Sequence, residues 1–259
     1  MLFSANIGFL YTELPIPDRI RAAKRDGFDA VECHFPYDVP AAEVKAALEE
    51  TGLAMLGLNT VPGNTAAGDF GLAALAGRED EARAAVEQAV EYGAAIGAAN
   101  VHVMAGRTDG GAAAEAAYRA TLAHACDLAA MKGMAVLIEP INLRDAWGYH
   151  LSRVEHAAEI VEALGRDNLR IMFDCYHTQI MQGDLSLRFL AHREVIGHVQ
   201  IAAVPDRGEP DGGEICFERL LGGFAEAGWS APVGAEYKPR GGSTAGGLGW
   251  LGPMRAALA

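Results

Sequence analysis

The sequence predicts a single (β/α)8 barrel, the TIM-barrel fold, that spans residues 1–259 as one domain. Eight short β-rich apolar segments alternate with amphipathic helical segments along the chain. The length of 259 residues fits the roughly 250 residues that are typical of this fold. No linker, tail or low-complexity segment interrupts the alternation, and the composition does not change from unit to unit.

The predicted strands are short and mostly apolar, as expected for strands that are covered on both faces. Successive β-then-α units of uniform composition imply a parallel sheet that is closed on itself. An open doubly wound sheet is the alternative, but it usually carries a glycine-rich phosphate loop after its first strand. The segment GFLYTELP in that position is not such a loop. In chain order, the predicted strands are residues 3–9, 30–35, 54–60, 100–106, 135–141, 169–177, 195–202 and 232–239.

The segments between the strands are rich in Ala, Glu, Leu and Arg and are predicted as helices. Several end in a glycine close to the next strand, as at Gly27, Gly52 and Gly133, and glycine is the residue that a left-handed helix C-cap favours. Two stretches, 61–77 and the glycine-rich 240–249, are predicted as long loops, which often close over a substrate at a barrel mouth. The clearest helices are predicted at 15–26, 40–51, 78–97, 111–132, 152–165 and 216–227, with weaker patterns at 184–193 and 243–258.

Composition and charge limit the classes of partner. Hydrophobic residues make up 51% of the chain and charged residues 21%, which favours a sizeable core over disorder. The formal net charge of −13 disfavours a nucleic acid or a membrane surface as partner, because an acidic surface is repelled by both. A small anionic substrate is still compatible, provided that positive side chains are concentrated at its site.

The cysteines and the N-terminus indicate a reduced, cytoplasmic protein. An even number of cysteines is compatible with two disulfides, but the four are widely spaced, form no CxxC pair and resemble neither a disulfide framework nor a zinc knuckle. The N-terminal segment MLFSANIGFLY lacks the basic region and the cleavage site of a signal peptide. No apolar run approaches the roughly 18 residues that a membrane helix requires. The cysteines are Cys33, Cys126, Cys175 and Cys216.

Oxygen-bearing side chains stand at the ends of the last four predicted strands. The side chains are separated by about one βα unit each, so they fall on adjacent strands and would point at one spot at the C-terminal mouth of the barrel. They are Glu139 in LIEPIN, Asp174 in IMFDCYH, Gln200 in GHVQIA and Glu236 in GAEYKP.

Three carboxylates buried together without a cation would repel one another and be forced to take up protons. A divalent ion removes that cost, and ligation by oxygen alone suits Mg²⁺ or Mn²⁺. The sequence therefore predicts one divalent metal ion at this mouth. The alternative is that each acid caps a helix or pairs with a surface arginine.

Three histidines lie close to these strand ends. His177 lies just past the strand that ends with Asp174, where it can hydrogen-bond a substrate oxygen. His198 precedes Gln200 by two residues, so it shares a strand face with Gln200 and is expected to point inward, one layer deeper. His102 opens the segment VHVMAG and is a further candidate for substrate binding. A lone histidine is more often structural than functional, and that alternative holds for all three.

Basic side chains follow the seventh and eighth predicted strands. In a protein this acidic, Arg207, Lys238 and Arg240 near the metal ligands suggest recognition of a carboxylate or phosphate. The alternative is that these are ordinary surface charges exposed to solvent, which applies most of all to Arg240. Glu32 and His34, at the end of the second strand, can line the pocket from the other side or serve a structural role.

Seven segments, which hold most of these residues, resemble the hydroxypyruvate isomerases, which are xylose-isomerase-like TIM barrels. The resemblance runs from the first strand to the final helix without a large gap. IEPIN and the D-x-Y-H-x-Q-I-M-x-G-D stretch are specific, whereas HVMAG alone is weak. The segments are ECHFPYD (32–38), HVMAG (102–106), IEPIN (138–142), DCYHTQIMQGDL (174–185), GHVQIA (197–202) and EYKP (236–239) with GLGW (247–250).

The resemblance implies roles for single residues. Glu139, Asp174, Gln200 and Glu236 match the family's metal ligands, and Glu139 and Glu236 also match its two acid/base carboxylates. Ketose 3-epimerases of the same superfamily usually have histidine where this chain has Gln200, which favours the isomerase branch. Relatives are commonly dimers or tetramers, but the sequence carries no assembly signature of its own.

One loop departs from the family pattern. The family commonly reads close to A-D-x-P-G-R-H-E-P-G, whereas residues 202–211 read AAVPDRGEPD. Arg207 and Glu209 are kept, but an aspartate and a histidine are missing, one on each side of Arg207. Because this loop reaches the site, the departure bears on which substrate is bound.

The expected reaction is the isomerisation of hydroxypyruvate to tartronate semialdehyde. A metal-chelated α-hydroxy carbonyl substrate would lose a proton to one carboxylate, pass through an enediolate and regain a proton on the neighbouring carbon. Arg207 or Lys238 would hold the substrate carboxylate and His177 a terminal oxygen. No redox cofactor is required.

Other functions remain open at this point. The same site would serve a 2-oxo-tetronate isomerase or a ketose 3-epimerase. An endonuclease of the same superfamily would need a metal cluster and a basic DNA-binding face, against which the net charge of −13 and Gln200 both speak. A non-catalytic sugar-binding barrel predicts that Glu139 and Glu236 can be replaced without loss of binding.

Overall fold

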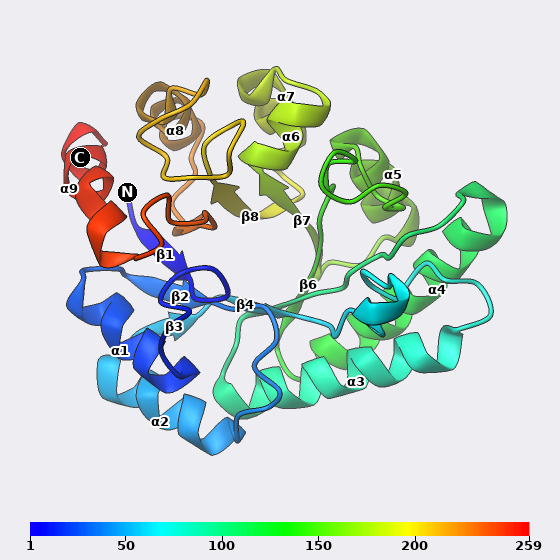
Figure 1. Cartoon of the computed structure of the whole chain (residues 1–259). Helices are drawn as coiled ribbons and strands as arrows, with labels where there is room; N and C mark the ends of the chain where they lie inside the picture. Colours follow the sequence, from blue (N-terminus) through cyan, green and yellow to red (C-terminus); the bar gives the residue numbers. More distant parts are fainter. Residues whose placement is uncertain (259) are drawn as a thin grey trace.

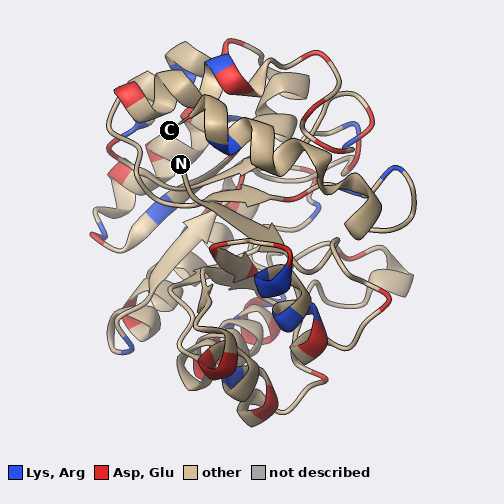
Figure 2. Ribbon diagram, turned by 90° about the vertical axis from the view of Figure 1, so that its left-hand side faces the viewer, with Lys and Arg blue, Asp and Glu red and all other residues tan. Residues whose placement is uncertain are grey.

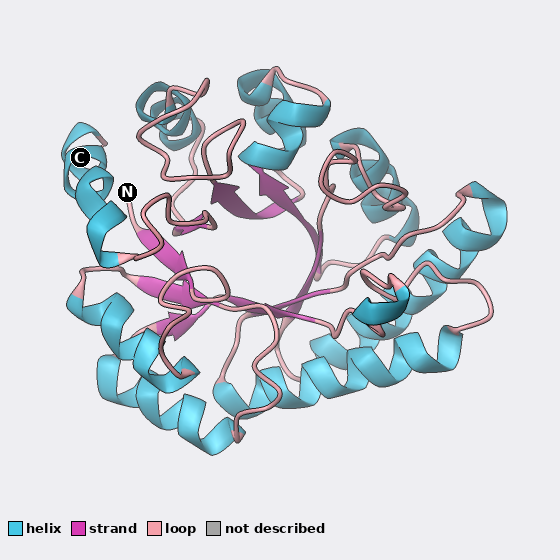
Figure 3. Ribbon diagram, viewed as in Figure 1, coloured by secondary structure: helices cyan, strands magenta, loops and turns pink. Residues whose placement is uncertain are grey.

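The computed structural model describes residues 1–258 and forms a closed barrel of parallel strands surrounded by helices (Figure 1, Figure 3). The strand order is β3-β2-β1-β9-β8-β7-β6-β5-β4, and every pairing is parallel. This confirms the predicted TIM barrel. The strands are β1 (Phe3–Asn6), β2 (Ala30–Glu32), β3 (Ala54–Met55), β4 (Gly57–Asn59), β5 (Asn100–His102), β6 (Ala135–Ile138), β7 (Leu169–Asp174), β8 (Ile196–Ile201) and β9 (Val233–Ala235).

The third predicted strand, 54–60, is divided into β3 and β4, so the described residues form nine strands where eight were predicted. β3 pairs with β2, and β4 pairs with β5. Between them, the carbonyl oxygen of Leu56 accepts a hydrogen bond from the Asn100 side chain at 2.6 Å rather than from a strand backbone. The Cys33 amide donates to the Gly57 carbonyl at 3.0 Å, which links the two edges and closes the ring.

The sixth predicted strand, 169–177, ends earlier than expected. β7 stops at Asp174, and a helix, α6 (Cys175–Met181), begins at the next residue. The Asp174 carboxylate accepts hydrogen bonds from the backbone amides of Tyr176 and His177, at 2.6 Å and 3.4 Å. This is an N-cap, which supplies partners to amides that the first helical turn leaves unpaired. His177 therefore lies in a helix, and the prediction of strand through residue 177 was wrong.

The helices lie outside the strands and bury apolar faces against them (Figure 3). Between α7 and α8, Phe189 and Phe224 stack with ring centroids 3.8 Å apart, and Phe173 of β7 packs on both. The helices are α1 (Ile16–Arg25), α2 (Ala41–Thr51), α3 (Glu79–Ile96), α4 (Gly111–Ala130), α5 (Val154–Leu164), α6, α7 (Leu185–His192), α8 (Phe217–Glu226) and α9 (Leu251–Ala257), with 3-10 turns η1 (Thr65–Ala67) and η2 (Ala245–Trp250).

Each predicted helix is present, with ends that differ by one or two residues, except that 243–258 divides into η2 and α9. Trp250, where these two meet, packs edge-on against Phe3 of β1 at 5.4 Å between ring centroids. The C-terminal helix thus covers the first strand, and the first and last described residues lie close together, with the Met1 amino group 3.5 Å from the Leu258 carbonyl oxygen (Figure 1). Within residues 1–258, no helix combines the length and the apolar character needed to cross a membrane.

The loop over 61–77 is fastened to the barrel by a close backbone contact. Gly71 forms an antiparallel bridge with Ala105, just past β5. Gly71 has φ of 114°, and a Cβ there would lie 2.7 Å from the Gly106 amide nitrogen. Only glycine fits this conformation and this approach. The bridge holds Phe70 at the barrel mouth, where it lines a cavity described below.

Basic and acidic residues are interspersed along the outer helices in the ribbon of Figure 2. Ion pairs form along and between outer helices, as between Arg21 and both Asp18 and Glu50, each at 2.8 Å. The side drawn in Figure 2 shows, among the described residues, no continuous basic face of the kind that nucleic-acid binding requires. The formal net charge of the whole chain is −13.

Candidate active site

Four adjacent strands bring the predicted ligands to one end of the barrel. Glu139 directly follows β6, Asp174 ends β7, Gln200 lies in β8 and Glu236 directly follows β9. Asp174 and Gln200 are register partners in neighbouring strands. All four side chains are buried, with residue exposures between 1% and 6%. The strand ends therefore concentrate three carboxyl groups and one amide in a space that excludes most water.

Three oxygen atoms of this group have no hydrogen-bond partner: Oε1 of Glu139, Oδ2 of Asp174 and Oε1 of Gln200. Burying an unpaired oxygen of this kind costs about 1–3 kcal/mol, and more when the group is charged. All three are hard oxygen donors from neighbouring strands, which is the donor set that Mg²⁺ and Mn²⁺ prefer. The residues present therefore fit a divalent cation. Glu139, Asp174 and His177 also bring potential ligand atoms within 4.8 Å of one another.

Glu236 is held by hydrogen bonds to both of its carboxylate oxygens. Asn6 of β1 donates to Oε1 at 2.9 Å, and the His34 ring nitrogen Nε2 lies 2.8 Å from the same oxygen. The Arg207 guanidinium donates to Oε2 at 2.5 Å. The carboxylate thus has a fixed orientation at the mouth, which is a requirement for a group that exchanges a proton with a substrate carbon.

Arg207 supplies a positive charge to the carboxylates. Its Nη2 atom lies 3.6 Å from Asp174 Oδ2 as well as 2.5 Å from Glu236 Oε2. The guanidinium packs over the rings of Phe9 and Tyr176, each 5.0 Å from the guanidinium carbon to the ring centroid. Arg207 has φ of 57°, in the left-handed region that a branched or long side chain seldom adopts. Such strain is typical of functional positions.

The pKa values of the three carboxyl groups are pushed apart. Burial raises the pKa of Glu139 well above its usual range, and the neighbouring Glu236 and Asp174 carboxylates raise it further. Burial raises the pKa of Asp174 to about 7, against the opposing effect of Arg207. At Glu236, burial is outweighed by Arg207 and His34, so the pKa of this carboxyl is lowered. A divalent cation would favour the ionised form of all three.

His177 faces the carboxylates with a defined tautomer. The Asn142 side-chain amide lies 2.6 Å from Nδ1 of His177 and donates to it, so Nε2 carries the ring proton. Nε2 lies 3.5 Å from Glu139 Oε1 and 3.6 Å from Asp174 Oδ2. Burial lowers the pKa of His177 well below its usual value, and Arg207 adds to the effect. A neutral histidine that offers an N–H is suited to hydrogen-bond a substrate oxygen.

His102 is buried on the opposite side of Glu139. Its Nδ1 atom lies 3.3 Å from the Asn59 side-chain oxygen and 3.7 Å from Glu139 Oε2, whereas its Nε2 atom has no hydrogen-bond partner. Burial lowers the pKa of His102 to about 3. The ring is therefore neutral and leaves one polar atom for another group.

Beneath the mouth, Glu32 fixes the direction of Gln200. The Gln200 amide donates to Glu32 Oε1 at 2.7 Å, which leaves its carbonyl oxygen Oε1 without a partner. His198 lies 2.6 Å from the other Glu32 oxygen, one layer deeper than Gln200, as its spacing suggested. Burial by itself disfavours the charged form of both side chains. The charge and hydrogen bond of His198 outweigh burial at Glu32 and lower its pKa, and those of Glu32 outweigh burial at His198 and raise its pKa. A Cβ at Gly234 would lie 2.7 Å from both Glu32 oxygens, so glycine makes the space.

A cavity of about 260 Å³ opens above these residues. Glu139, Glu236, Arg207, His177 and His102 all line it, together with the aromatic side chains of Phe9, Phe35 and Phe70. The cavity therefore combines three carboxylates (Glu139, Asp145 and Glu236), one guanidinium and three imidazoles (His34, His102 and His177) within partly apolar walls.

Lys238 and Arg240 are placed elsewhere. Lys238 is exposed, lies over the Phe9 ring at 5.5 Å and is not among the residues that line this cavity. Arg240 pairs with Asp206 at 2.8 Å and with Glu209 at 3.3 Å, within its own pair of loops. Its side chain fills the space beside Gly208, where a Cβ would lie 2.5 Å from Arg240 Nε. This is the position at which the family pattern has histidine.

Several cavity or mouth residues were not singled out from the sequence, among them Asn6, Phe9 and Asn59. Asn6 and Asn59 end β1 and β4, so the rule that identified the ligands, a polar residue at a strand end, also applies to them. Phe9 has no such signal, because its position depends on the turn that follows β1.

Comparisons with known proteins show one fold, and the curated relatives at 36–45% identity carry isomerase names. The family model described as xylose isomerase-like TIM barrel matches residues 20–254. The 2-oxo-tetronate isomerase of Cupriavidus necator is 45% identical over 254 residues, covering 97% of each chain. The hydroxypyruvate isomerase of Escherichia coli is 36% identical over 256 residues, covering 98% of this chain and 99% of its own. A Brucella melitensis crystal structure described as an AP endonuclease, family 2, superposes with a TM-score of 0.93 at 38% identity, covering 97% of this chain and 98% of its own.

Proposed function

The chain belongs to the xylose isomerase-like TIM barrel family, and on that premise we propose that it is an isomerase that converts hydroxypyruvate into tartronate semialdehyde. Full-length relatives that carry isomerase names support the reaction class. The observation that carries the proposal is that Glu139 and Glu236 line one cavity together with Arg207. Two carboxylates serve proton transfer between neighbouring carbons, and the guanidinium serves a substrate carboxylate.

The metal in this proposal is one Mg²⁺ or Mn²⁺ ion. Glu139, Asp174, Gln200 and Glu236 would hold it, since all offer oxygen and three of them have an unpaired oxygen. When bound, a divalent cation polarises the substrate carbonyl and makes the neighbouring C–H more acidic.

The residues of the chain would then move the protons. One carboxylate, Glu139 or Glu236, takes the proton from carbon 3 of hydroxypyruvate, and a proton is placed on carbon 2 by the same or the other carboxylate. A second proton moves from the carbon-3 oxygen to the carbon-2 oxygen, which balances the conversion of ketone to aldehyde. Arg207 holds the substrate carboxylate through parallel N–H donors, and His177 donates its Nε2 proton to a substrate oxygen. The aromatic walls exclude water from the intermediate.

A four-carbon 2-oxo acid is the second candidate substrate. The relative from Cupriavidus necator is named a 2-oxo-tetronate isomerase and is 45% identical to this chain, against 36% for the Escherichia coli hydroxypyruvate isomerase. The same carboxylates and the same proton path serve either acid, because the reacting carbons are equivalent.

Proton NMR in D₂O tests the proposal. Metal-stripped protein is incubated with hydroxypyruvate, then Mn²⁺ or Mg²⁺ is restored. We expect tartronate semialdehyde, with deuterium on carbon 2, only after the metal is added. Glu236→Gln should lose this activity while still folding, and Glu226→Gln on α8 is the matched control for loss of a negative charge. Metal binding without turnover of hydroxypyruvate would shift the assignment to 2-oxo-tetronate, and failure to bind metal would overturn the proposal.

Cellular location and partners follow the same proposal. Within residues 1–258 the cysteines form no disulfide, and three of them are buried, which suits a reducing compartment such as the cytoplasm. The partner is a small sugar acid rather than a nucleic acid, since the positive charge in the site is the single guanidinium of Arg207 among three carboxylates.

A further inference from the structure

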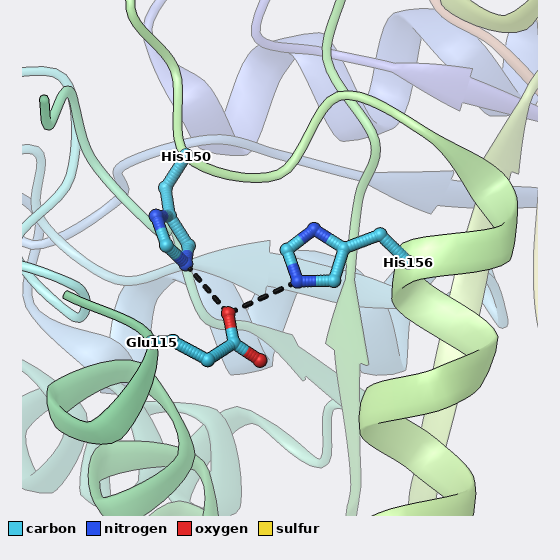
Figure 4. Close-up of side chains that lie close together, drawn as sticks. All are labelled: Glu115, His150 and His156. Carbon is cyan, nitrogen blue, oxygen red and sulfur yellow. Dashed lines mark hydrogen bonds and ion pairs between the residues drawn. The ribbon is translucent and has the colours of Figure 1, made fainter. Parts of the chain in front are cut away.

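Glu115, His150 and His156 form a second cluster of metal-ligand side chains, outside the barrel (Figure 4). Glu115 lies in the second turn of α4, His150 in the loop that follows β6, and His156 in the first turn of α5. The Nε2 atoms of both imidazoles lie 3.0 Å from the same oxygen, Oε2 of Glu115. Three elements that are separate in sequence thus point a carboxylate and two imidazoles at one spot.

The distances suit a shared cation. In tetrahedral zinc sites, nitrogen and oxygen ligands lie about 2.0–2.2 Å from the ion, so neighbouring ligand atoms are roughly 3.3 Å apart. The ligand atoms of the cluster lie within 4.8 Å of one another, and two of the three separations are 3.0 Å. Small side-chain rotations therefore suffice to place an ion between them.

Contacts with neighbouring side chains orient two of the proposed ligands, Glu115 and His150. Arg119 donates to Oε1 of Glu115 at 2.6 Å, which leaves Oε2 for the histidines. Thr108 Oγ1 lies 3.1 Å from Nδ1 of His150, so Nε2 is the nitrogen that faces Glu115. Partners of this kind orient metal ligands and are part of most metal sites.

The exposure of the three side chains is also compatible with a metal site. The His150 side chain is 4% exposed, whereas those of Glu115 and His156 are 25% and 30% exposed, so solvent reaches one side of the cluster. A water molecule can complete four-coordination from that side.

We propose that Glu115, His150 and His156 bind a Zn²⁺ ion, or a similar late transition-metal ion, at a site separate from the barrel mouth. Two imidazoles and one carboxylate select such ions, whereas the oxygen donors at the mouth select Mg²⁺ or Mn²⁺. The inference does not depend on the proposed isomerase activity, because it uses none of the residues of that site.

The position gives the ion a structural role. His150 belongs to the loop over 139–153, and the same loop contributes Ile141, Asp145 and Ala146 to the cavity lining. Next to His150, the Tyr149 hydroxyl accepts a hydrogen bond from the Ala105 amide at 2.9 Å. An ion held by α4, α5 and this loop would therefore fix one wall of the cavity.

Zn²⁺ binding to metal-stripped protein, measured by titration calorimetry, tests the proposal. The Asp174→Asn variant serves as background so that the mouth site does not contribute, and excess Mg²⁺ is kept in the buffer. We expect one Zn²⁺ per chain in this background and at least tenfold weaker binding when His156→Ala is added. His124→Ala is the matched control, because His124 is a half-buried histidine of α4 that lies 3.5 Å from Glu87 and is not part of the cluster. Equal Zn²⁺ binding in the His156→Ala and His124→Ala proteins would overturn the proposal.

Thermal unfolding gives a second readout that does not depend on stoichiometry. A ligand that binds only the folded state raises the Tm. In the Asp174→Asn background, Zn²⁺ should raise the Tm of the His124→Ala control protein and leave that of the His156→Ala protein unchanged, while Mg²⁺ should shift neither because the mouth site is disabled. If the His156→Ala protein is unstable without metal, His156→Gln replaces it with the same expectation. A Zn²⁺ shift that survives both substitutions contradicts the assignment.

Discussion

Glu32 acts on the mouth of the barrel through Gln200 rather than by lining the substrate cavity. A side-chain amide can flip by about 180°, and only its hydrogen-bond partners decide which end faces the other predicted metal ligands. By accepting the amide hydrogen at 2.7 Å, the Glu32 carboxylate keeps the Gln200 carbonyl oxygen directed elsewhere and free. Glu32 is thus a positioning residue, which the sequence left undecided because burial does not separate positioning from structure.

Glu32→Gln should weaken Mn²⁺ binding by about 10–100-fold, the usual cost of removing a partner that orients a metal ligand. The new amide can donate as well as accept, so it no longer fixes the orientation of Gln200, and His198 loses its charged partner. Titration calorimetry of the metal-stripped protein measures the change. Glu49→Gln, an exposed acid on α2 that pairs with Lys45 at 3.8 Å, is the control. Equal Kd values for both variants would contradict the positioning role.

Arg207→Lys tests the substrate carboxylate contact. Lysine keeps the charge but lacks the planar fork that matches a carboxylate, and charge-assisted hydrogen bonds contribute about 1.5–3 kcal/mol. We expect kcat/KM for hydroxypyruvate to fall roughly 10–100-fold. Steady-state kinetics check this, with Arg193→Lys at the end of α7 as the control. Unchanged kinetics would remove Arg207 from the substrate site.

Local sequence patterns predict most of the helices and strands, whereas two departures from the prediction depend on side-chain contacts with the backbone. Apolar periodicity and helix-ending glycines were enough to predict the strands and helices to within a few residues, because these signals are local. The break at Leu56 depends on the Asn100 side chain, which is 44 residues away. The start of α6 depends on the Asp174 carboxylate capping two amides, inside a run that otherwise resembles a strand. Side-chain-to-backbone contacts of this kind leave no periodic signal.

Packing between α7 and α8 should be sensitive to one aromatic residue. Phe189 is 1% exposed and contacts the rings of Phe173, Phe224 and Trp229. Phe189→Ala leaves a cavity there and should lower the free energy of unfolding by about 3–5 kcal/mol. Leu187→Ala on the same helix removes a 63% exposed side chain and should change it by less than about 0.5 kcal/mol. Urea unfolding measures both, and similar values for the two would contradict the packing argument.

At the scale of the whole molecule, the barrel joins residues that lie far apart in sequence. Asn6 donates to Glu236 across 230 residues, and the Tyr11 amide donates to Thr244 Oγ1 at 2.7 Å. The site residues on strands could be predicted because the closed sheet puts every strand end at one mouth. The positions of loop side chains could not be predicted from the sequence. Lys238 and Arg240 are basic residues in loops after predicted strands, as Arg207 is, yet only Arg207 of the three lines the cavity.

Metal-free protein should lose stability as the pH rises. The pKa of Asp174 is raised to about 7 in the folded chain, from 3.8, so the folded state binds its proton more tightly than the unfolded state. The resulting stabilisation is complete below about pH 4 and is lost as the pH rises through about 7, a change on the order of 4 kcal/mol. The raised pKa of Glu139 acts with the same sign.

Urea unfolding of metal-stripped protein between pH 5 and pH 8 measures this loss. Asp174→Asn should flatten the dependence, because an amide does not titrate, and Mn²⁺ should do so in the unsubstituted protein by holding the ionised carboxylates. A steeper loss in Asp174→Asn than in the unsubstituted protein would contradict the assignment of the proton to Asp174.

The loop over 139–153 borders both the cavity and the Glu115 cluster, so the proposed Zn²⁺ site and the proposed substrate site share one structural element. If Zn²⁺ at His150 and His156 restrains the loop in the form that binds substrate, it increases substrate affinity by some factor. Linkage then requires substrate to increase Zn²⁺ affinity by the same factor. A change in the concentration of available zinc would then change the fraction of the protein that binds the proposed substrate acid. A change in the concentration of the acid would likewise change the fraction that binds zinc.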